Sequence, residues 1–243
     1  MQNQNAGPNL TYNLTQQLGA AIVRGHYAID KPFPTEAELS IQFNISRSVT
    51  REAVKMLTAK GLIASRPRQG IRVMTSSQWN MFDADVLSWT LSARPSLELL
   101  REFTQLRMAI EPEAAKLAAE NYRDKEKLKA IGDALVRMQQ ADEGLDDPLA
   151  SDIEFHCAIL GASNNRFFLQ LREFIQVALR VSIASTNQLK GVLSASYDDH
   201  KRIYDAIARG DQEQASNAMK VLLVEVMQLI NVSIESAQPA LKK

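Results

Sequence analysis

The segment 33–74, FPTEAELSIQFNISRSVTREAVKMLTAKGLIASRPRQGIRVM, limits the fold of this chain more than any other stretch. Thr35 and Glu38 have the spacing of a capping box, which predicts that a short helix begins there. Ser46 is a good N-cap for a second helix, and Gly61 supplies the left-handed residue that commonly ends one. The segment therefore predicts two short helices joined by a tight turn.

Two β-prone runs follow the second helix. Residues 62–65 and 71–74 are short and largely apolar, and residues 67–70 between them, PRQG, favour a turn. Two helices followed by a two-stranded wing predict a winged helix-turn-helix. In that motif the second helix lies in the major groove of DNA.

The first turns of the second helix are polar, whereas Ala53, Val54 and Leu57 are expected to face the core. Arg47 and Arg51 are four residues apart and share a helix face, and an arginine can bond both O6 and N7 of guanine. Hydroxyl groups suit phosphates or base edges. The predicted DNA contacts are Ser46, Arg47, Ser48, Thr50 and Arg51 in the helix, with Arg66, Arg68 and Arg72 in the wing. The alternative is a solvated charged helix face beside a structural hairpin.

Charge is distributed unevenly along the chain. The 243 residues contain 28 Lys and Arg and 28 Asp and Glu, so the formal net charge is zero. Residues 1–75 contain nine basic and four acidic residues, a surplus of five positive charges, and the remainder carries five surplus negative charges. A basic first third and an acidic remainder are typical of a DNA-binding domain joined to a separate sensing or assembly domain.

The chain carries no sign of export. Its single cysteine, Cys157, excludes an internal disulfide framework and fits a reducing compartment. The polar N-terminus is neither a signal nor a transit peptide, and no apolar run approaches the ~20 residues of a membrane span. We therefore expect a cytoplasmic protein with no membrane partner.

From residue 96 onward, apolar residues recur at helical spacing without a strand signal, which predicts an antiparallel bundle of six or seven helices. Trp79 and Trp89 are expected to bury against this second domain or a partner subunit. The fold class is thus mainly α, a winged helix-turn-helix followed by an all-α bundle. The predicted parts are a disordered tail (1–9), the winged domain (10–75), a linker (76–95) and an effector-binding and dimerisation domain (96–238).

A group of ionisable residues stands out in the predicted bundle. Asp152 and His156 are four residues apart in one helix, so both project to the same side, and His200 lies in a later helix. One carboxylate with two imidazoles is a suitable ligand set for Zn, Ni or Mn. The commoner alternative for such residues is a hydrogen-bonded histidine in the core.

The quoted segment 33–63 resembles the DNA-binding domain of GntR-family transcription regulators. That resemblance implies DNA contacts at Ser46, Arg47, Ser48, Arg51 and the wing Gly70. The segments DIEFHCAILGASNN and DDHKRIYDAIARGD resemble the FCD ligand-binding domain of the FadR branch of the family. The pattern WNxxDxDVLxW resembles the linker of family members that regulate sugar-acid catabolism, and together these segments extend over nearly the whole chain.

The resemblance also implies a site in the second domain. Many FCD domains hold a divalent metal with one Asp and three His. Asp152, His156 and His200 fall on the first three positions, and the fourth falls on Leu222, which cannot ligate a metal. The site is then either three-coordinate from the protein, completed by water or effector, or a metal-free polar pocket.

The family pocket also contains an arginine, to which Arg107 corresponds. Arg107 could bind an effector carboxylate with two hydrogen bonds. Its alternative is a salt bridge with Glu111, four residues later on the same helix. Asn165 and Arg180 are further candidates for the effector pocket.

These patterns predict a regulator, more specifically a repressor, that leaves its double-stranded operator when a small carboxylate such as an aldonate binds. We expect a homodimer, because one arginine pair reads too few bases for operator-level affinity. One alternative is the same kind of regulator responding to another organic acid or a fatty acyl ligand. Another is a metal-dependent enzyme, because three ligands with an open position are also a catalytic pattern, but no general base or nucleophile accompanies the trio.

Overall fold

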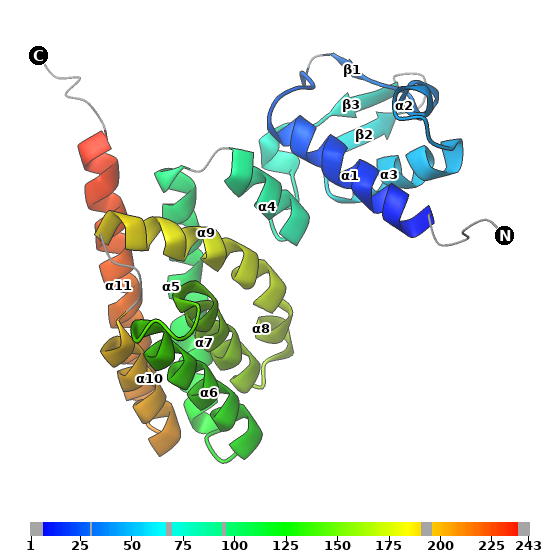
Figure 1. Cartoon of the computed structure of the whole chain (residues 1–243). Helices are drawn as coiled ribbons and strands as arrows, with labels where there is room; N and C mark the ends of the chain where they lie inside the picture. The colour runs from blue at the N-terminus through cyan, green and yellow to red at the C-terminus, as the bar shows by residue number, and fades with distance from the viewer. Residues whose placement is uncertain (1–6, 30, 67–69, 94–95, 191–195, 238–243) are drawn as a thin grey trace, which may run out of the picture. The chain divides into compact units, whose positions relative to one another are not determined.

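The computed structural model describes residues 7–29, 31–66, 70–93, 96–190 and 196–237. Contacts within the chain divide it into two compact units, residues 1–95 and residues 96–243. Each unit is described by itself (Figure 1).

The first unit is built on three helices: α1 (Gly7–Val23), α2 (Glu36–Gln42) and α3 (Arg47–Ala59). The predicted caps are confirmed, since Thr35 and Glu38 form a reciprocal capping box and the Ser46 hydroxyl accepts a hydrogen bond from the Val49 amide. Helix α1 packs against α3, which places it beneath the helix expected to read DNA. The predicted tail 1–9 is too long, because α1 begins at Gly7, where Pro8 suits a first helical turn.

The wing is a three-stranded antiparallel sheet of β1 (Pro32–Phe33), β2 (Ile63–Arg66) and β3 (Gly70–Val73), in the order β1-β3-β2. The two longer strands match the prediction, with Ile63 opposite Val73. Strand β1 was missed, because two residues are too few for a periodic pattern. The residues between β2 and β3, 67–69, lie outside the described part of the chain.

The segment predicted as a linker belongs to the first unit. It contains a short 3₁₀ helix, η1 (Ser76–Gln78), and α4 (Ala84–Ala93), which packs on α1. Trp89 is buried in the core of the first unit, and Trp79 packs against the same core. A Cβ atom at Gly19 would lie 2.3 Å from the Trp89 ring, so a glycine is required for this close approach. Both tryptophans were expected to bury against the second domain or a partner subunit, whereas they pack in the core of the first unit.

The second unit is entirely helical in its described residues, which confirms the predicted fold class. Its most extensive packing is between α5 and α11. Helix α7 packs against α5, α6 and α9, and α10 packs against α5, α6 and α11. The helices are α5 (Leu97–Glu120), α6 (Lys125–Asp142), α7 (Pro148–Ala162), α8 (Arg166–Gln170), α9 (Arg172–Lys190), α10 (Tyr197–Arg209) and α11 (Gln212–Ala237).

Helix α11 differs from the expectation that no apolar stretch is long enough for a membrane span. By length and composition alone, its segment Gln212–Ser236 could cross a membrane, with a mean hydropathy of 1.3 over its most apolar window. One such helix is weak evidence. Met219, Leu223 and Ile230 are fully buried where α11 packs along α5, although only 22% of the apolar window is buried.

Candidate functional site

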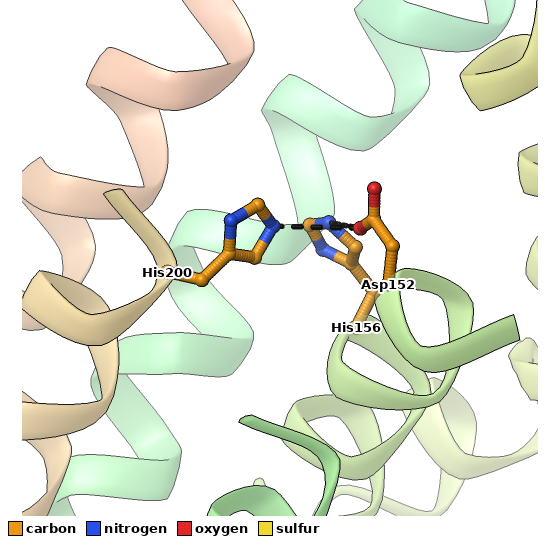
Figure 2. Close-up of side chains that lie close together, drawn as sticks. All are labelled: Asp152, His156 and His200. Atoms are coloured by element: carbon orange, nitrogen blue, oxygen red, sulfur yellow. Dashed lines mark ion pairs between the residues drawn. The ribbon is translucent and has the colours of Figure 1, made fainter. Parts of the chain in front are cut away.

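Three ionisable side chains meet in the interior of the second unit (Figure 2). Asp152 and His156 come from α7, whose start is fixed by the Asp147 cap and Pro148, so that the four-residue spacing aims both side chains the same way. His200 reaches them from the first turn of α10. All three are buried, with at most 3% of their surface exposed.

The distances within this cluster suit a small cation. The Asp152 Oδ1 atom lies 3.2 Å from His156 Nε2 and 3.4 Å from His200 Nε2. The ligand atoms of all three residues lie within 4.8 Å of one another. Two ligands of a tetrahedral zinc ion, each at ~2.0–2.1 Å, are about 3.4 Å apart. The observed separations are therefore those of atoms that could share one ion.

A hydrogen bond to the main chain determines which ring nitrogen of His200 is protonated and which keeps its lone pair. Its Nδ1 atom lies 2.8 Å from the main-chain oxygen of Ser196, which can only accept, so Nδ1 carries the proton. Nε2 then presents a lone pair toward Asp152 in the neutral ring. Both His200 Nε2 and Asp152 Oδ1 are buried without a hydrogen-bond partner among the residues that the structure describes. Buried polar atoms left in this way are costly, and a metal ion between them would satisfy both.

Glu111 is the second partner of His156. Its Oε2 atom lies 2.8 Å from His156 Nδ1, so a donated proton there leaves Nε2 facing Asp152. The same carboxylate accepts hydrogen bonds from Arg107 Nε at 2.6 Å and Nη2 at 3.2 Å. A carboxylate that holds the far nitrogen of a histidine is the usual support of a metal-ligating imidazole.

The charges of this cluster are strongly coupled. Burial alone would raise the pKa of Glu111, but the charges of Arg107 and His156 lower it to about 2. Burial also opposes ionisation of Asp152, yet its contacts with His156 and His200 hold the pKa of that carboxyl well below its ordinary value. Two buried carboxylates thus face one arginine. The remaining negative charge can be balanced by a proton on His156 or by a bound cation.

The alternative predicted for Arg107, a salt bridge with Glu111, is present in the structure. Arg107 also lies within 3.5 Å of both ring nitrogens of His156, so it belongs to the cluster as predicted. Leu222, at the fourth family position, lies half-buried on α11 and offers no ligand atom.

The structure does not bring Asn165 and Arg180 into this cluster. The Asn165 side chain caps α8, where it accepts hydrogen bonds from the Phe167 and Phe168 amides. Arg180 is exposed on α9 and lines a cavity on the other side of α7. Their predicted role beside the histidines is therefore not supported, because each is committed to a different surface.

The predicted DNA-reading residues are largely exposed at the start of α3. Ser46, Arg47, Ser48 and Arg51 face solvent, and Gly70 of the wing is exposed with a φ of +73°. Thr50 is an exception, because it is fully buried and its hydroxyl donates to the Arg47 main-chain oxygen at 2.9 Å. The prediction that Thr50 contacts DNA is therefore wrong.

The wing arginines are described only in part. The main chain of Arg66 lies in β2, and Arg72 is exposed on β3. Arg68 lies outside the described residues, so its predicted DNA contact stays a prediction.

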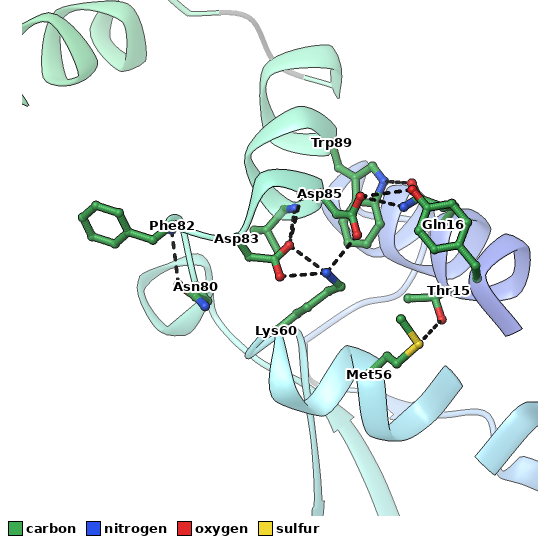
Figure 3. A network of polar contacts seen from close by, with 11 residues as sticks. Thr15, Gln16, Met56, Lys60, Asn80, Phe82, Asp83, Asp85 and Trp89 are labelled. Carbon is green, nitrogen blue, oxygen red and sulfur yellow. Dashed lines mark hydrogen bonds and ion pairs between the residues drawn. The ribbon is translucent and has the colours of Figure 1, made fainter. Parts of the chain in front are cut away.

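A polar network joins α3 to α4 (Figure 3). The Lys60 ammonium, at the end of α3, lies 2.7 Å from Asp83 Oδ2 and 2.9 Å from Asp85 Oδ2. Asp83 caps α4 through the amides of Asp85 and Val86. Gln16 of α1 bonds both Asp85 and the indole nitrogen of Trp89. This network ties the predicted linker to the helix that precedes the wing.

Comparison with known protein families matches a different family model to each of the two units. Residues 10–73 match the bacterial regulatory proteins of the gntR family, and residues 102–225 match the FCD domain. The chain is 33% identical over 223 residues to the transcriptional regulator YieP of Escherichia coli K12, covering 90% of this chain and 94% of that one. The chain belongs to the GntR family. It is a GntR regulator with an FCD domain, as the resemblance of segment 33–63 and of the segments around His156 and His200 predicted.

Other relatives match most of the length of this GntR regulator. It is 31% identical over 216 residues to the galactonate operon transcriptional repressor of E. coli K12, covering 88% of this chain and 94% of that one. A solved structure of Lar, which controls the agr system of Listeria monocytogenes, has the same fold, with 18% identity, a TM-score of 0.53 and coverage of 91% and 96%. YieP and the galactonate operon repressor are transcription regulators, so the enzyme alternative is set aside.

Sequence reasoning missed two contacts of the regulator's site. Glu111 was considered only as a partner of Arg107, although its carboxylate also holds His156. The Ser196 carbonyl that fixes His200 was not considered at all. A signal for the second existed, because Ser196 is a good N-cap four residues before His200.

Proposed function

We propose that this regulator is a repressor released from its operator when a small sugar acid of the aldonate type binds in the FCD domain. The observation that carries the proposal is the convergence of Asp152, His156 and His200 beside buried Arg107. The likeness to the galactonate operon repressor supports a sugar acid over a fatty acyl ligand. A long acyl chain would also be poorly served by so many buried charges.

Asp152, His156 and His200 would hold one divalent cation, Zn, Ni or Mn. Bound there, the ion would supply positive charge and open coordination positions for a carboxylate. Ser196 and Glu111 hold the two imidazoles in the required tautomers. Leu222 leaves the fourth family position without a protein ligand, so water or the effector would complete the site.

Arg107 would contribute a second positive charge to effector binding. Its Nε and Nη2 atoms face Glu111, so an effector carboxylate would meet the guanidinium at its remaining donors. This arrangement keeps the arginine in place before the effector arrives. Preorganised charge of this kind reduces the cost of binding.

DNA release follows from coupling two sites. A homodimer would present two α3 helices to two operator half-sites, with Arg47 and Arg51 contacting base edges. Effector binding would favour an arrangement of the two reading helices that no longer fits the operator. Such coupling is typically ~1–3 kcal/mol, or roughly 5- to 150-fold in affinity.

The test is fluorescence anisotropy of the full chain on labelled DNA from its own upstream region. Galactonate, other aldonates, a short organic acid and a fatty acid are titrated separately, each with and without a chelator. Release by an aldonate that the chelator abolishes is expected. Release by the fatty acid alone would overturn the ligand assignment, and unchanged release with the chelator would overturn the metal.

Two variants separate the functions within the same assay. Arg51→Ala should lose DNA affinity while aldonate binding, followed by calorimetry, persists. Arg107→Ala leaves Glu111 without its buried partner and so should destabilise the second unit; below its unfolding transition it should still bind DNA through the first unit but respond weakly to the aldonate. Unaltered release from Arg107→Ala would remove this arginine from the site. Sedimentation of the protein on and off DNA tests the homodimer, and a monomer on the operator would contradict it.

A further inference from the structure

A second pair of cavities lies on the outer face of α7. One, of about 620 Å³, is lined by residues of α6, α7 and α8 with Arg172 of α9, and the other, of about 270 Å³, by residues of α6, α7 and α9. Glu154, Cys157 and Arg172 line both cavities, so the two adjoin, and together they are here called the outer groove. Its size is within the range of small-molecule sites.

The outer groove is separate from the buried cluster. Along α7, Asp152 and His156 point inward and are buried, whereas Glu154 is exposed and Ala158 and Gly161 are half-buried. At 100° per residue these groove residues lie on the opposite side of the helix from the histidine. A ligand in the outer groove would therefore touch the helix that carries the metal-type ligands without entering their site.

Positive charge accumulates around the outer groove. Arg166, Arg172 and Arg180 line it, and within the described residues none of the three forms an ion pair. The other basic residues of the lining already have partners, since Lys127 pairs with Asp124 and Arg137 with Asp146.

This surplus is unusual for the domain. Residues 96–243 contain 18 Lys and Arg against 22 Asp and Glu, so the second unit is acidic as a whole. The two acidic side chains of the lining are already paired, because Asp133 binds Lys129 outside the groove and Glu154 binds Arg137 within it. Three unpaired arginines that gather in an acidic domain indicate an anionic ligand.

The side chains of α9 indicate which end of the groove would bind the charged group of a ligand. Arg172, Gln176 and Arg180 are spaced four residues apart and face the smaller cavity together. Arg172 also reaches the larger cavity, where a Cβ atom added to Gly161 would meet nothing within 4 Å. The floor there is open, and the lining of this cavity includes the polar residues Asn164 and Asn165 beside small apolar residues. The larger cavity can thus hold the hydroxylated part of a ligand, and the arginines can bind its charged head group.

We propose that the outer groove is a second small-molecule site, for a polyhydroxylated compound with a dianionic head. Arg172 and Arg180 bind the head, which is either a phosphate monoester or a dicarboxylate. The proposal is independent of the metal and of the effector assigned to the buried cluster.

The test is calorimetric titration of the full chain in the presence of a chelator. The probes are sorbitol 6-phosphate, its neutral counterpart sorbitol, inorganic phosphate and glucarate. Binding of sorbitol 6-phosphate or glucarate, with none of sorbitol, is expected, and the two charged probes distinguish a phosphate head from a dicarboxylate. Absence of binding by every charged probe at ~10 mM would overturn the proposal.

Variants locate the binding. The double variant Arg172→Gln/Arg180→Gln should weaken the charged probe at least about tenfold, the loss expected for a charge-assisted contact. Arg209→Gln is the matched control, an exposed arginine at the end of α10, and should change affinity less than about twofold. Circular dichroism checks that the variants are folded. Equal losses in the double variant and the control, or loss of binding in Arg107→Ala instead, would overturn the location.

Discussion

Glu111 Oε2 and His156 Nδ1 lie 2.8 Å apart, although they belong to different helices, and both residues are buried. The same carboxylate accepts from Arg107 Nε at 2.6 Å. One side chain therefore neutralises a buried guanidinium and sets the tautomer of an imidazole that faces Asp152. A substitution at Glu111 should consequently affect both the stability of the second unit and the properties of its site.

Glu111→Leu should destabilise the second unit by about 3–5 kcal/mol, because it leaves Arg107 as an uncompensated buried charge. The double variant Arg107→Met/Glu111→Leu should recover most of that free energy of unfolding, since both charges are then absent. Urea unfolding followed by far-ultraviolet circular dichroism measures both. A double variant as unstable as Glu111→Leu would show that shape, and not charge, dominates at this pair.

Lys60→Met should destabilise the first unit by about 1–3 kcal/mol, because Asp83 and Asp85 lose a charged hydrogen-bond partner that is only 11% exposed. Unfolding is followed by tryptophan fluorescence, since both tryptophans of the chain pack in this unit. Lys55→Met is the matched control: its partner is Glu52, both side chains are more than half exposed, and a change within about 0.5 kcal/mol is expected. Equal losses in the two variants would contradict the role of the network.

The network also predicts an acid dependence. Burial opposes ionisation of Asp85, but Lys60 and Gln16 lower its pKa below the ordinary 3.8. A carboxyl with a lowered pKa stabilises the folded state fully above the unfolded value and loses this contribution as pH falls through the folded value. The difference in urea midpoint between the native chain and Asp85→Asn should therefore be constant above pH 3.8 and shrink below it. In the Lys60→Met background the shrinkage should be much smaller, and an equal effect there would exclude Lys60 as its cause.

Substitutions at the neighbouring residues Thr50 and Arg51 of α3 should differ in their effect on DNA binding. Arg51→Ala should cost roughly 1–3 kcal/mol of operator affinity if its guanidinium reads a base pair. Thr50→Val should leave operator affinity unchanged, because Thr50 is buried and bonded to the main chain of Arg47. Anisotropy titrations on the same labelled operator compare both. Loss of affinity in Thr50→Val without loss of stability would restore this residue to the contact surface.

Much of the fold follows from local patterns. The capping residues Thr35 and Ser46 and the left-handed Gly61 mark helix ends through contacts within a few residues, and these are visible in the sequence. Thr50 was misplaced because its polarity was given more weight than its spacing. It stands three and four residues before Ala53 and Val54, both of which face the core.

The parts that were missed depend on contacts distant in sequence. Trp89 packs against Gly19 across seventy residues, and no local pattern indicates that partner. The same applies to Glu111, whose bond to His156 requires α5 and α7 to be adjacent. Spacing within α7 aligned Asp152 with His156, but His200 lies on another helix, so its grouping with them rested on residue type alone until the resemblance to a family supported it.

The packing of Trp89 against Gly19 also determines where this regulator can be recombined with others. A chimera joined after residue 75 would keep a DNA-binding module stripped of α4, with the hydrophobic face around Gly19 uncovered and Lys60 without its carboxylates. A junction at residues 94–95 would transfer α3, the polar network around Lys60 and α4 together as one unit. For this chain the exchangeable cassette is therefore some twenty residues longer than the winged helix-turn-helix itself.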